Sequence, residues 1–236
     1  MFQKSPKYYG LVYGYKNYKE ESAVVKALLQ HLNPNYRTYL DIACGTGEHA
    51  KYLSETYQVD GLDLHPDFVA ITQAKLPKGE VFVADMTDFD LGKKYDVVSC
   101  IYSSIGYART PEKLARALRA FKKHLNKGGV ILIEPWARPD TWKTGEVRTF
   151  TGESDGIKIL RMSETETTAD GLSCVILHHL VGEAGKVEYF AERHEMGLFS
   201  PDDFKRAFEE AELEVDYHAD FKGLSERGLY IGREKS

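Results

Sequence analysis

The stretch Leu40-Asp41-Ile42-Ala43-Cys44-Gly45-Thr46-Gly47 decides how the rest of this chain is interpreted. It follows a strand-like segment, 36–39, and leads into a helix-compatible segment, 48–53. Glycines in a tight turn allow positive φ and let the backbone approach a ligand, because no Cβ stands in the way. Amide N–H groups at the start of the following helix can then face that ligand. The pattern predicts a cofactor-binding turn, although an ordinary strand-to-helix turn would use the same residues.

A second acidic residue supports the cofactor interpretation. The apolar run 59–64 carries Asp63 near its end, 22 positions after Asp41. A doubly wound sheet places a carboxylate there, on the ribose of a bound cofactor. S-adenosylmethionine (SAM) and nicotinamide dinucleotides both use this geometry. The dinucleotide pattern Gly-x-Gly-x-x-Gly/Ala is satisfied by Gly45, Gly47 and Ala50.

Asp41 distinguishes the two cofactors. It lies four residues before Gly45, close to the position that a pyrophosphate would occupy, and two anions at close range repel each other. SAM has no phosphate, and its methionine end carries an ammonium and a sulfonium that a carboxylate attracts. The residues therefore favour SAM over a nicotinamide dinucleotide.

Composition places the chain among soluble globular proteins. Its 236 residues are enough for one sizeable domain or a domain with an insertion, and 42% of them are apolar and 28% charged. No apolar run is long enough to span a membrane, and segment 1–7 lacks the apolar core of a signal peptide. We expect a cytoplasmic protein without membrane association.

Charge and cysteine content indicate which partners to exclude and which redox state to expect for the thiols. The net charge is −5, and basic and acidic residues are interspersed without a Lys/Arg block, which argues against nucleic acid as a partner. The three cysteines show neither a disulfide framework nor metal-ligand spacing, so we expect reduced and mostly buried thiols at Cys44, Cys100 and Cys174.

Strand-like and helix-like segments alternate along the first half of the chain. Such alternation predicts an α/β fold with a doubly wound, mostly parallel sheet of Rossmann-like type. The predicted elements after Asp63 are a helix over 66–75, a buried strand over 81–83, a strand over 95–101, a helix that starts at Pro111 and is ended by Gly128-Gly129, and a strand over 130–133. A helix over 201–210 and two closing strands, 213–218 and 228–232, follow near the end of the chain.

The segment 147–197 differs, because it contains no helical pattern. Strand-like runs over 157–163, 173–181 and 187–196 are separated by Gly-containing hairpin signals. We expect an antiparallel insertion after the fifth strand, beside the carboxyl ends of the parallel sheet, where it would serve as a substrate platform or a dimer surface. The predicted division is an N-terminal helical lid over 1–35, a SAM-binding core over 36–135 and 198–236, and the insertion over 136–197.

Six short motifs occur in one order over nearly the whole chain: Asp41-Ile42-Ala43-Cys44-Gly45-Thr46-Gly47, Ser103-Ser104-Ile105-Gly106, Glu134-Pro135-Trp136, His179-Leu180-Val181, Leu198-Phe199 and Arg227-Gly228-Leu229. The first resembles motif one of class I SAM-dependent methyltransferases, with Ala43 in place of the usual first glycine. Together the motifs resemble the TDP-amino-sugar N,N-dimethyltransferases that finish mycaminose and desosamine. Tyr9-Gly10-Leu11-Val12, with Tyr18 beyond it, is similar to that family's N-terminal Tyr-Asp-Leu-Val stretch.

The resemblance implies a methyltransferase that acts on the amine of a nucleotide-linked deoxysugar. It implies that Asp41, Ala43 and Gly45 face the methionine part of SAM, Asp63 and Leu64 the ribose, Asp85 and Met86 the adenine, and that Tyr18 and Ile101 also lie beside the cofactor. On the substrate side it implies Ser103, Trp136 and Arg227, and Arg227 falls where the family contacts the diphosphate. A guanidinium suits this role because its planar fork matches a pair of phosphate oxygens.

The chain departs from the family at two positions. Tyr107 stands where the family commonly has a histidine, and Gly10 replaces an aspartate. Tyr107 could donate or accept a hydrogen bond but is a poor base near neutral pH, because the reference pKa of tyrosine is about 10. Tyr9 and Tyr107 are the candidate catalytic residues, as a hydroxyl-bearing wall around the amine, although tyrosine is abundant here and could serve only packing.

Several alternatives remain open. Because neighbouring residues on a strand point to opposite faces, His178 and His179 are not expected to share a metal, and we predict no metal site. The chain could instead methylate another small amine, carboxylate or hydroxyl, or it could bind SAM without transferring a methyl group. A homodimer is a further expectation.

Overall fold

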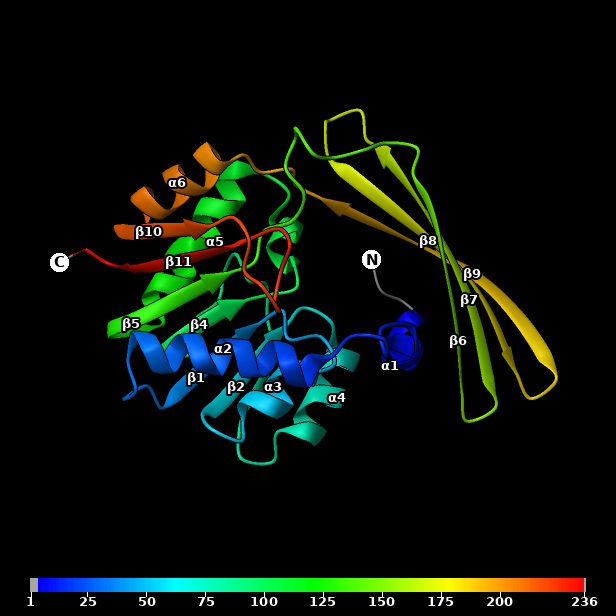
Figure 1. Cartoon of the computed structure of the whole chain (residues 1–236), viewed down its shortest axis with the longest axis horizontal. Coiled ribbons are helices and arrows are strands. Elements are labelled where there is room, and N and C mark those ends of the chain that lie inside the picture. The colour runs from blue at the N-terminus through cyan, green and yellow to red at the C-terminus, as the bar shows by residue number, and fades with distance from the viewer. Residues whose placement is uncertain (1–3, 236) are drawn as a thin grey trace.

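The main sheet has seven strands in the spatial order β10-β11-β5-β4-β1-β2-β3 (Figure 1). The computed structural model describes residues 4–235. Neighbouring strands from β3 to β5 pair in parallel, whereas β11 is antiparallel to both β5 and β10. The strands are β1 (Thr38–Ile42), β2 (Gln58–Asp63), β3 (Val81–Val83), β4 (Tyr95–Cys100), β5 (Leu125–Ile133), β10 (Leu213–His218) and β11 (Leu229–Glu234). The predicted mostly parallel sheet is confirmed.

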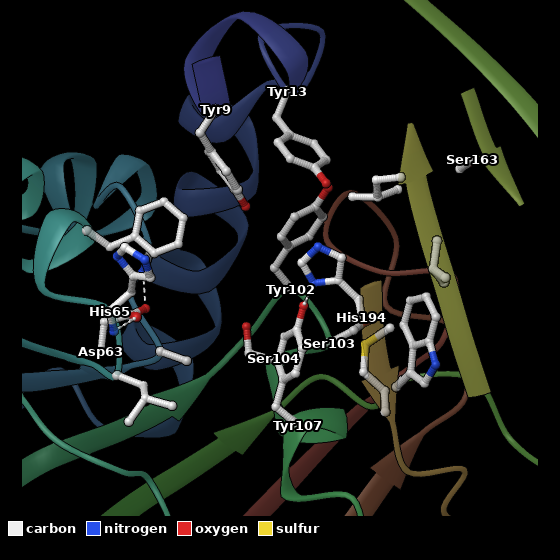
Figure 2. Close-up of a pocket in the computed structure, with 18 of the residues that line it drawn as sticks. Tyr9, Tyr13, Asp63, His65, Tyr102, Ser103, Ser104, Tyr107, Ser163 and His194 are labelled. Carbon is white, nitrogen blue, oxygen red and sulfur yellow. Dashed lines mark hydrogen bonds between the residues drawn. The ribbon is translucent and has the colours of Figure 1, made fainter. Parts of the chain in front are cut away.

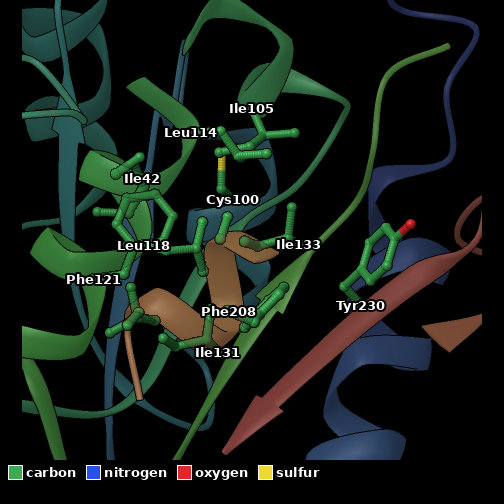
Figure 3. Close-up of a cluster of buried hydrophobic side chains, with 14 of the residues drawn as sticks. Ile42, Cys100, Ile105, Leu114, Leu118, Phe121, Ile131, Ile133, Phe208 and Tyr230 are labelled. Atoms are coloured by element: carbon green, nitrogen blue, oxygen red, sulfur yellow. The ribbon is translucent and has the colours of Figure 1, made fainter. Parts of the chain in front are cut away.

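Helices cover both faces of this sheet, so the fold is doubly wound α/β, as the sequence predicts. On one face, α5 (Pro111–Lys123) and α6 (Pro201–Glu210) bury their apolar residues in one core cluster (Figure 3). On the other face, α2 (Tyr18–Leu32) and α3 (Glu48–Leu53) contribute to a second cluster. The remaining helices are α4 (Pro66–Lys75), α1 (Tyr9–Val12) and the 3-10 turns η1 (Ser5–Tyr8) and η2 (Ser104–Ala108).

The helix starts follow from their capping residues. Thr110 accepts a hydrogen bond from the backbone N–H of Lys113 and precedes Pro111, as the sequence predicts. Ser200 and Asp203 form a reciprocal capping box at the start of α6. Both α4 and α6 span the predicted ranges.

Two predictions in this part of the chain are wrong. The strand over 81–83 is an edge strand rather than a buried one, and Val83 is 55% exposed. The pair Gly128-Gly129 does not end α5, which already ends at Lys123; it lies inside β5. Gly129 is needed there because a Cβ would lie 2.7 Å from the carbonyl oxygen of Asp96 on the neighbouring strand.

A second sheet has four strands in sequential antiparallel order (Figure 1): β6 (Val147–Ser154), β7 (Ile157–Thr167), β8 (Ser173–Glu183) and β9 (Lys186–Met196). The predicted hairpins are confirmed, and each of their three turns contains a glycine with positive φ: Gly156, Gly171 and Gly185. The sequence pattern lacks β6, because that strand is mostly exposed and has no apolar run.

Alternate residues of this second sheet point to opposite faces. His179 is buried and stacks on Phe190, on the inner face that is turned toward the main sheet. His178 is half-exposed and stacks on Tyr189, on the outer face. The expectation that the two neighbouring histidines point apart is confirmed.

The N-terminal segment has two parts with different packing. Tyr8 and Val12 form a small apolar cluster with Ile159, Val181 and Phe190 of the second sheet. In contrast, α2 belongs to the main sheet, against which Val25 and Leu29 are fully buried. Among residues 4–235, no helix is long and apolar enough to cross a membrane.

Candidate functional site

A cavity of about 690 Å³ lies between the carboxyl ends of β1, β2 and β4 and the inner face of the second sheet (Figure 2). Segments far apart in the sequence meet here, which agrees with the expected position of the insertion. Most sequence-predicted site residues line this cavity: Tyr9, Ala43, Gly45, Asp63, Leu64, Asp85, Met86, Ser103, Tyr107, Trp136 and Arg227.

The turn after β1 forms one end of the cavity. Ala43, Gly45 and Gly47 all have positive φ, between +54° and +71°. A Cβ on Gly45 would meet no atom within 4 Å, so this backbone is open for a ligand. A Cβ on Gly47 would lie 2.6 Å from the side chain of Thr72, so the second glycine allows α3 and α4 to pack closely.

Asp63 is held rigidly beside this turn. One carboxylate oxygen accepts the N–H of Gly45 at 2.9 Å, and the other accepts the N–H of His65 at 2.9 Å. Burial raises the pKa of Asp63, and these backbone hydrogen bonds offset part of that rise. A carboxylate has about four acceptor positions, so the group keeps the capacity to accept hydroxyl groups from a ligand.

Three predicted residues do not line the cavity. Asp41 is 3% exposed, accepts a hydrogen bond from the hydroxyl of Ser99 at 3.2 Å and lies behind the turn. Burial raises the pKa of Asp41 to about 6. The Tyr18 hydroxyl is buried without a hydrogen-bond partner in the described part of the chain, and Ile101 is 5% exposed in the interior. Their side chains support the site from behind.

The segment after β4 has a strained backbone. It is held in place by an acidic residue that the sequence did not predict as a site residue. Tyr102 and Ser103 have φ of +56° and +61°. Glu134, at the carboxyl end of β5, accepts the N–H of Tyr102 at 2.6 Å and the hydroxyl of Ser225 at 2.9 Å. Burial raises the pKa of Glu134. Its position at the end of a buried parallel strand is the signal that could have identified it.

Aromatic rings form the wall above the cavity. Tyr9 packs 4.4 Å from Tyr13 and 5.4 Å from Phe68, measured between ring centroids, and Tyr13 packs 5.8 Å from Tyr102. Burial raises the pKa of both Tyr9 and Tyr13, so their hydroxyls stay protonated near neutral pH. The four-residue spacing of Tyr9 and Tyr13, which places them on one helix face, could have revealed Tyr13.

The wall opposite Asp63 comes from η2 and the second sheet (Figure 2). The Tyr107 hydroxyl lies 2.9 Å from Nδ1 of His194. The guanidinium of Arg161 lies 5.0 Å from the ring of Tyr13 and 5.5 Å from that of Phe150. Sequence reasoning missed His194 and Arg161, because it does not reveal which inner-face residues of the insertion reach the cavity.

Arg227 and Trp136 mark the end opposite the glycine turn. The guanidinium lies 4.8 Å from the indole ring centroid and 4.0 Å from the carboxylate of Glu134. A second cavity of about 1100 Å³ adjoins here and shares both residues with the first. Its lining adds Trp142 and several basic side chains, Lys16, Arg138 and Lys143 among them, together with Glu134 and Glu146.

Comparisons with known proteins agree with this geometry. Residues 40–129 match a family model described as a methyltransferase domain. A SAM-bound amino pentose methyltransferase, CalS10 from Micromonospora echinaspora, has a TM-score of 0.85 and 27% identity, with coverage of 100% of this chain and 98% of that chain. Fold, site and these matches define a SAM-dependent methyltransferase of class I.

Two further relatives narrow the class. The dTDP-3-amino-3,6-dideoxy-alpha-D-glucopyranose N,N-dimethyltransferase of Streptomyces fradiae is 33% identical over 92% of this chain and 85% of its own length. The sugar N-methyltransferase KedS8 from Streptoalloteichus sp ATCC 53650 has a TM-score of 0.89 and 34% identity, with coverage of 100% of this chain and 94% of that chain. The chain belongs to the family of the TDP-amino-sugar N,N-dimethyltransferases.

Proposed function

We propose that this enzyme methylates the amino nitrogen of a TDP-linked deoxyamino sugar. The observation that carries the proposal is the order of features along one cavity. The glycine turn and Asp63 form one end, the hydroxyl-bearing wall of Tyr9 and Tyr107 lies between, and Arg227 marks the other end. Three relatives that match over most of their own length are named for dTDP-linked amino sugars, and such a substrate would place its amine near the tyrosines and its diphosphate near Arg227.

The cofactor end fits SAM. We assign the methionine part to Ala43 and Gly45, the ribose to Asp63 and Leu64, and the adenine to Asp85 and Met86. Bound SAM supplies an electrophilic methyl group together with its own leaving group. Asp41 favours such a cationic ligand through its charge from behind the turn, and Tyr18 and Ile101 pack in support.

The tyrosine wall would position the acceptor. The attacking amine must be neutral, with its lone pair aimed at the methyl carbon, and the hydroxyls of Tyr9 and Tyr107 are available to orient it by hydrogen bonds. Correct orientation and exclusion of water can lower a barrier by about 7 to 11 kcal/mol. Most of the protein's contribution to the rate would therefore come from positioning, with Ser103 beside the acceptor.

The end with Arg227 suits a nucleoside diphosphate. Its guanidinium is stacked on Trp136 and held by Glu134, which leaves a planar fork for phosphate oxygens. The adjoining cavity adds Arg138, Lys143 and a second indole, Trp142, whose centroid lies 6.1 Å from that of Trp136. Cations with nearby aromatic faces match a phosphate pair linked to a planar base.

The N-terminal part of the chain would act as a lid within the range 1–35, over a core of 36–135 and 198–236 with the substrate platform 136–197. Residues 4–12 support this division, because they lie against the second sheet. Lys7 forms an ion pair of 2.7 Å with Glu183, and Lys4 pairs with Glu188, both at the hairpin between β8 and β9. These exposed pairs are individually weak, and the apolar contacts of Tyr8 and Val12 with the second sheet contribute most of what holds the segment in place.

We propose a homodimer that forms through the outer face of the second sheet. Met162, Leu180 and Tyr189 lie there on three neighbouring strands and are 44%, 43% and 59% exposed. A contiguous apolar patch of this kind typically marks an interaction surface, and a second copy could present the same patch.

We also propose a cytoplasmic location, because Cys44, Cys100 and Cys174 are free thiols, the state that a reducing compartment maintains.

Isotope-labelled SAM and a panel of TDP-linked 3-amino and 4-amino sugars test the proposal. We expect label transfer to at least one sugar and a product mass that gives the number of methyl groups. Turnover of simple amines without turnover of any amino sugar would contradict the proposed substrate. Light scattering of the purified protein tests the dimer.

A further inference from the structure

Two titratable side chains from distant segments meet in the cavity wall opposite Asp63. Tyr107 lies on η2, 87 residues before His194 on β9, yet the hydroxyl oxygen and Nδ1 are 2.9 Å apart. Figure 2 shows the tyrosine hydroxyl directed toward the imidazole at the edge of the cavity. Both residues line that cavity, although His194 is only 3% exposed.

A carboxylate lies behind the imidazole. Oε2 of Glu192, which is 4% exposed, lies 3.9 Å from Nε2 of His194. Its other oxygen accepts the backbone N–H of Lys4 at 2.9 Å. The three groups therefore stand in a row, from the phenol at the cavity through the imidazole to the buried carboxylate.

Other titratable and charged groups adjoin this row from each neighbouring element. Asp63 of β2 acts on Tyr107 across the cavity, as does Tyr13 from the N-terminal segment. Arg161 of β7 and His179 of β8 lie on the inner face of the same sheet. Burial lowers the pKa of His179 to about 4, so it remains neutral near pH 7 and cannot replace His194 as a proton acceptor.

The direction of the hydrogen bond depends on the tautomer of His194, and the carboxylate of Glu192, 3.9 Å from Nε2, favours the tautomer that carries its ring proton on Nε2. Because burial raises the pKa of Tyr107 above its ordinary value, the group stays a phenol and is the natural donor. Nδ1 of His194 is then the acceptor, which puts the ring proton of the neutral imidazole on Nε2, toward Glu192. A tyrosine alone would be a poor base, but a tyrosine that donates to an imidazole can pass a proton on.

We propose that Tyr107 and His194 form a proton relay that converts the bound substrate ammonium into the neutral amine. One N–H bond of the ammonium breaks as an O–H bond forms on Tyr107. The original O–H bond of Tyr107 breaks as an N–H bond forms at Nδ1 of His194. The product is a neutral amine and an imidazolium beside the carboxylate of Glu192, with no change in total charge.

The relay rests on the proposed function, because methyl transfer to nitrogen requires a neutral amine. An aliphatic amine has a pKa near that of lysine, about 10.4, so it enters the site mostly protonated near neutral pH. The lone pair required for attack is then occupied by a proton. In this cavity between the two sheets, a base supplied by the protein replaces bulk water as the acceptor.

Two substitutions test the relay. Tyr107→Phe removes the hydroxyl, and His194→Gln keeps a hydrogen-bond acceptor but cannot take up a proton. Each should lower kcat at pH 7 by about 100-fold, within the range of general acid–base catalysis. The double variant should be no slower than the slower single variant, because both residues serve one step. Near pH 10 the variants should recover much of the wild-type rate, because roughly a quarter of an amine with a pKa of about 10.4 is then already neutral before it binds.

His179→Gln is the matched control. It replaces a buried histidine on the same face of the same sheet that has no contact with Tyr107, and we expect the wild-type pH profile. Calorimetry with SAM and thermal unfolding check that each variant remains folded.

The relay would be overturned if both single variants kept the wild-type rate at pH 7, or if their losses were equal at pH 7 and pH 10. Loss through packing alone would not recover at alkaline pH. Absence of turnover of every amino sugar by the wild-type enzyme would instead overturn the proposed function, and the relay with it.

Discussion

The two ends of the cavity are built in different ways. At the cofactor end, Gly45 and Asp63 lie 18 residues apart, and backbone N–H groups make the key hydrogen bonds. At the substrate end, side chains make the contacts: Tyr107 lies 87 residues from its partner His194, and Arg227 lies 124 residues from its partner Ser103. The first end depends on local chain geometry, whereas the second depends on how distant elements dock.

This difference predicts separable effects. Substitutions at the cofactor end should change SAM binding whatever the acceptor is, and those at the substrate end should change acceptor binding with SAM affinity intact.

The largest effect is expected for Gly47→Val. A Cβ at this position would lie 2.6 Å from Thr72, and φ of +71° is unfavourable for a β-branched residue. Strain and overpacking together should cost about 3 kcal/mol or more of stability. Urea denaturation measures this loss. Gly92→Val is the control, because φ there is +61° but no atom lies near the added Cβ; an equal loss in both variants would mean that contact with Thr72 is unimportant.

Asp63→Ala should have the second largest effect, which is a loss of SAM affinity. It removes a charged acceptor from the cavity, and hydrogen bonds to charged groups contribute about 1.5 to 3 kcal/mol, so SAM affinity should fall by roughly 10- to 100-fold. Calorimetry measures the change. Asp63→Asn should retain part of the affinity, because one acceptor oxygen remains. If SAM affinity were unchanged, the ribose would lie elsewhere.

Arg227→Ala should act only at the substrate end. Loss of a charge-assisted hydrogen bond predicts an increase of about 10-fold in KM for a diphosphate-linked sugar. SAM affinity should stay near the wild-type value. Arg227→Lys should rescue only part of KM, because an ammonium lacks the planar fork. A parallel loss of SAM affinity would show that the two ends are coupled.

The smallest effect concerns the pH dependence of stability at Asp41. Its pKa is raised to about 6 in the folded protein, above the ordinary value of 3.8, so the folded state binds the proton more tightly. The associated stability is complete below pH 4 and is lost as pH rises through 6. Asp41→Asn should therefore be more stable than wild type at pH 8 by on the order of 1 to 2 kcal/mol.

Near pH 4 that difference should disappear, and thermal unfolding at the two pH values checks it. Saturating SAM should shrink the gap at pH 8, since a cationic ligand favours the ionised carboxylate. If SAM left the gap unchanged, Asp41 would belong to the scaffold rather than to the cofactor end.

The sequence locates the glycine turn and Asp63 because the rules for them are local, whereas Asp41, Tyr18 and Ile101, which were also predicted beside the cofactor, do not line the cavity. Asp63 could be located from its spacing after a glycine turn, and the hairpins of the second sheet from Gly156 and Gly185. His194 and Arg161 could not be located, because period-two alternation shows which residues share a face but not which face meets the cavity. The position of Glu134 at the end of a buried parallel strand was a usable signal, but its partners could not be predicted, because they converge only after β4, β5 and the loop before β11 are assembled.

The alternation along β7, β8 and β9 also separates two directions of evolutionary change. Inner-face residues such as Arg161 and His194 line the cavity, and outer-face residues such as Met162 and Tyr189 are exposed. We therefore expect a substitution on the inner face to alter acceptor choice and a substitution on the outer face to alter assembly. Because this sheet lies outside the two core clusters of the main sheet, we expect such changes to leave the SAM-binding fold intact.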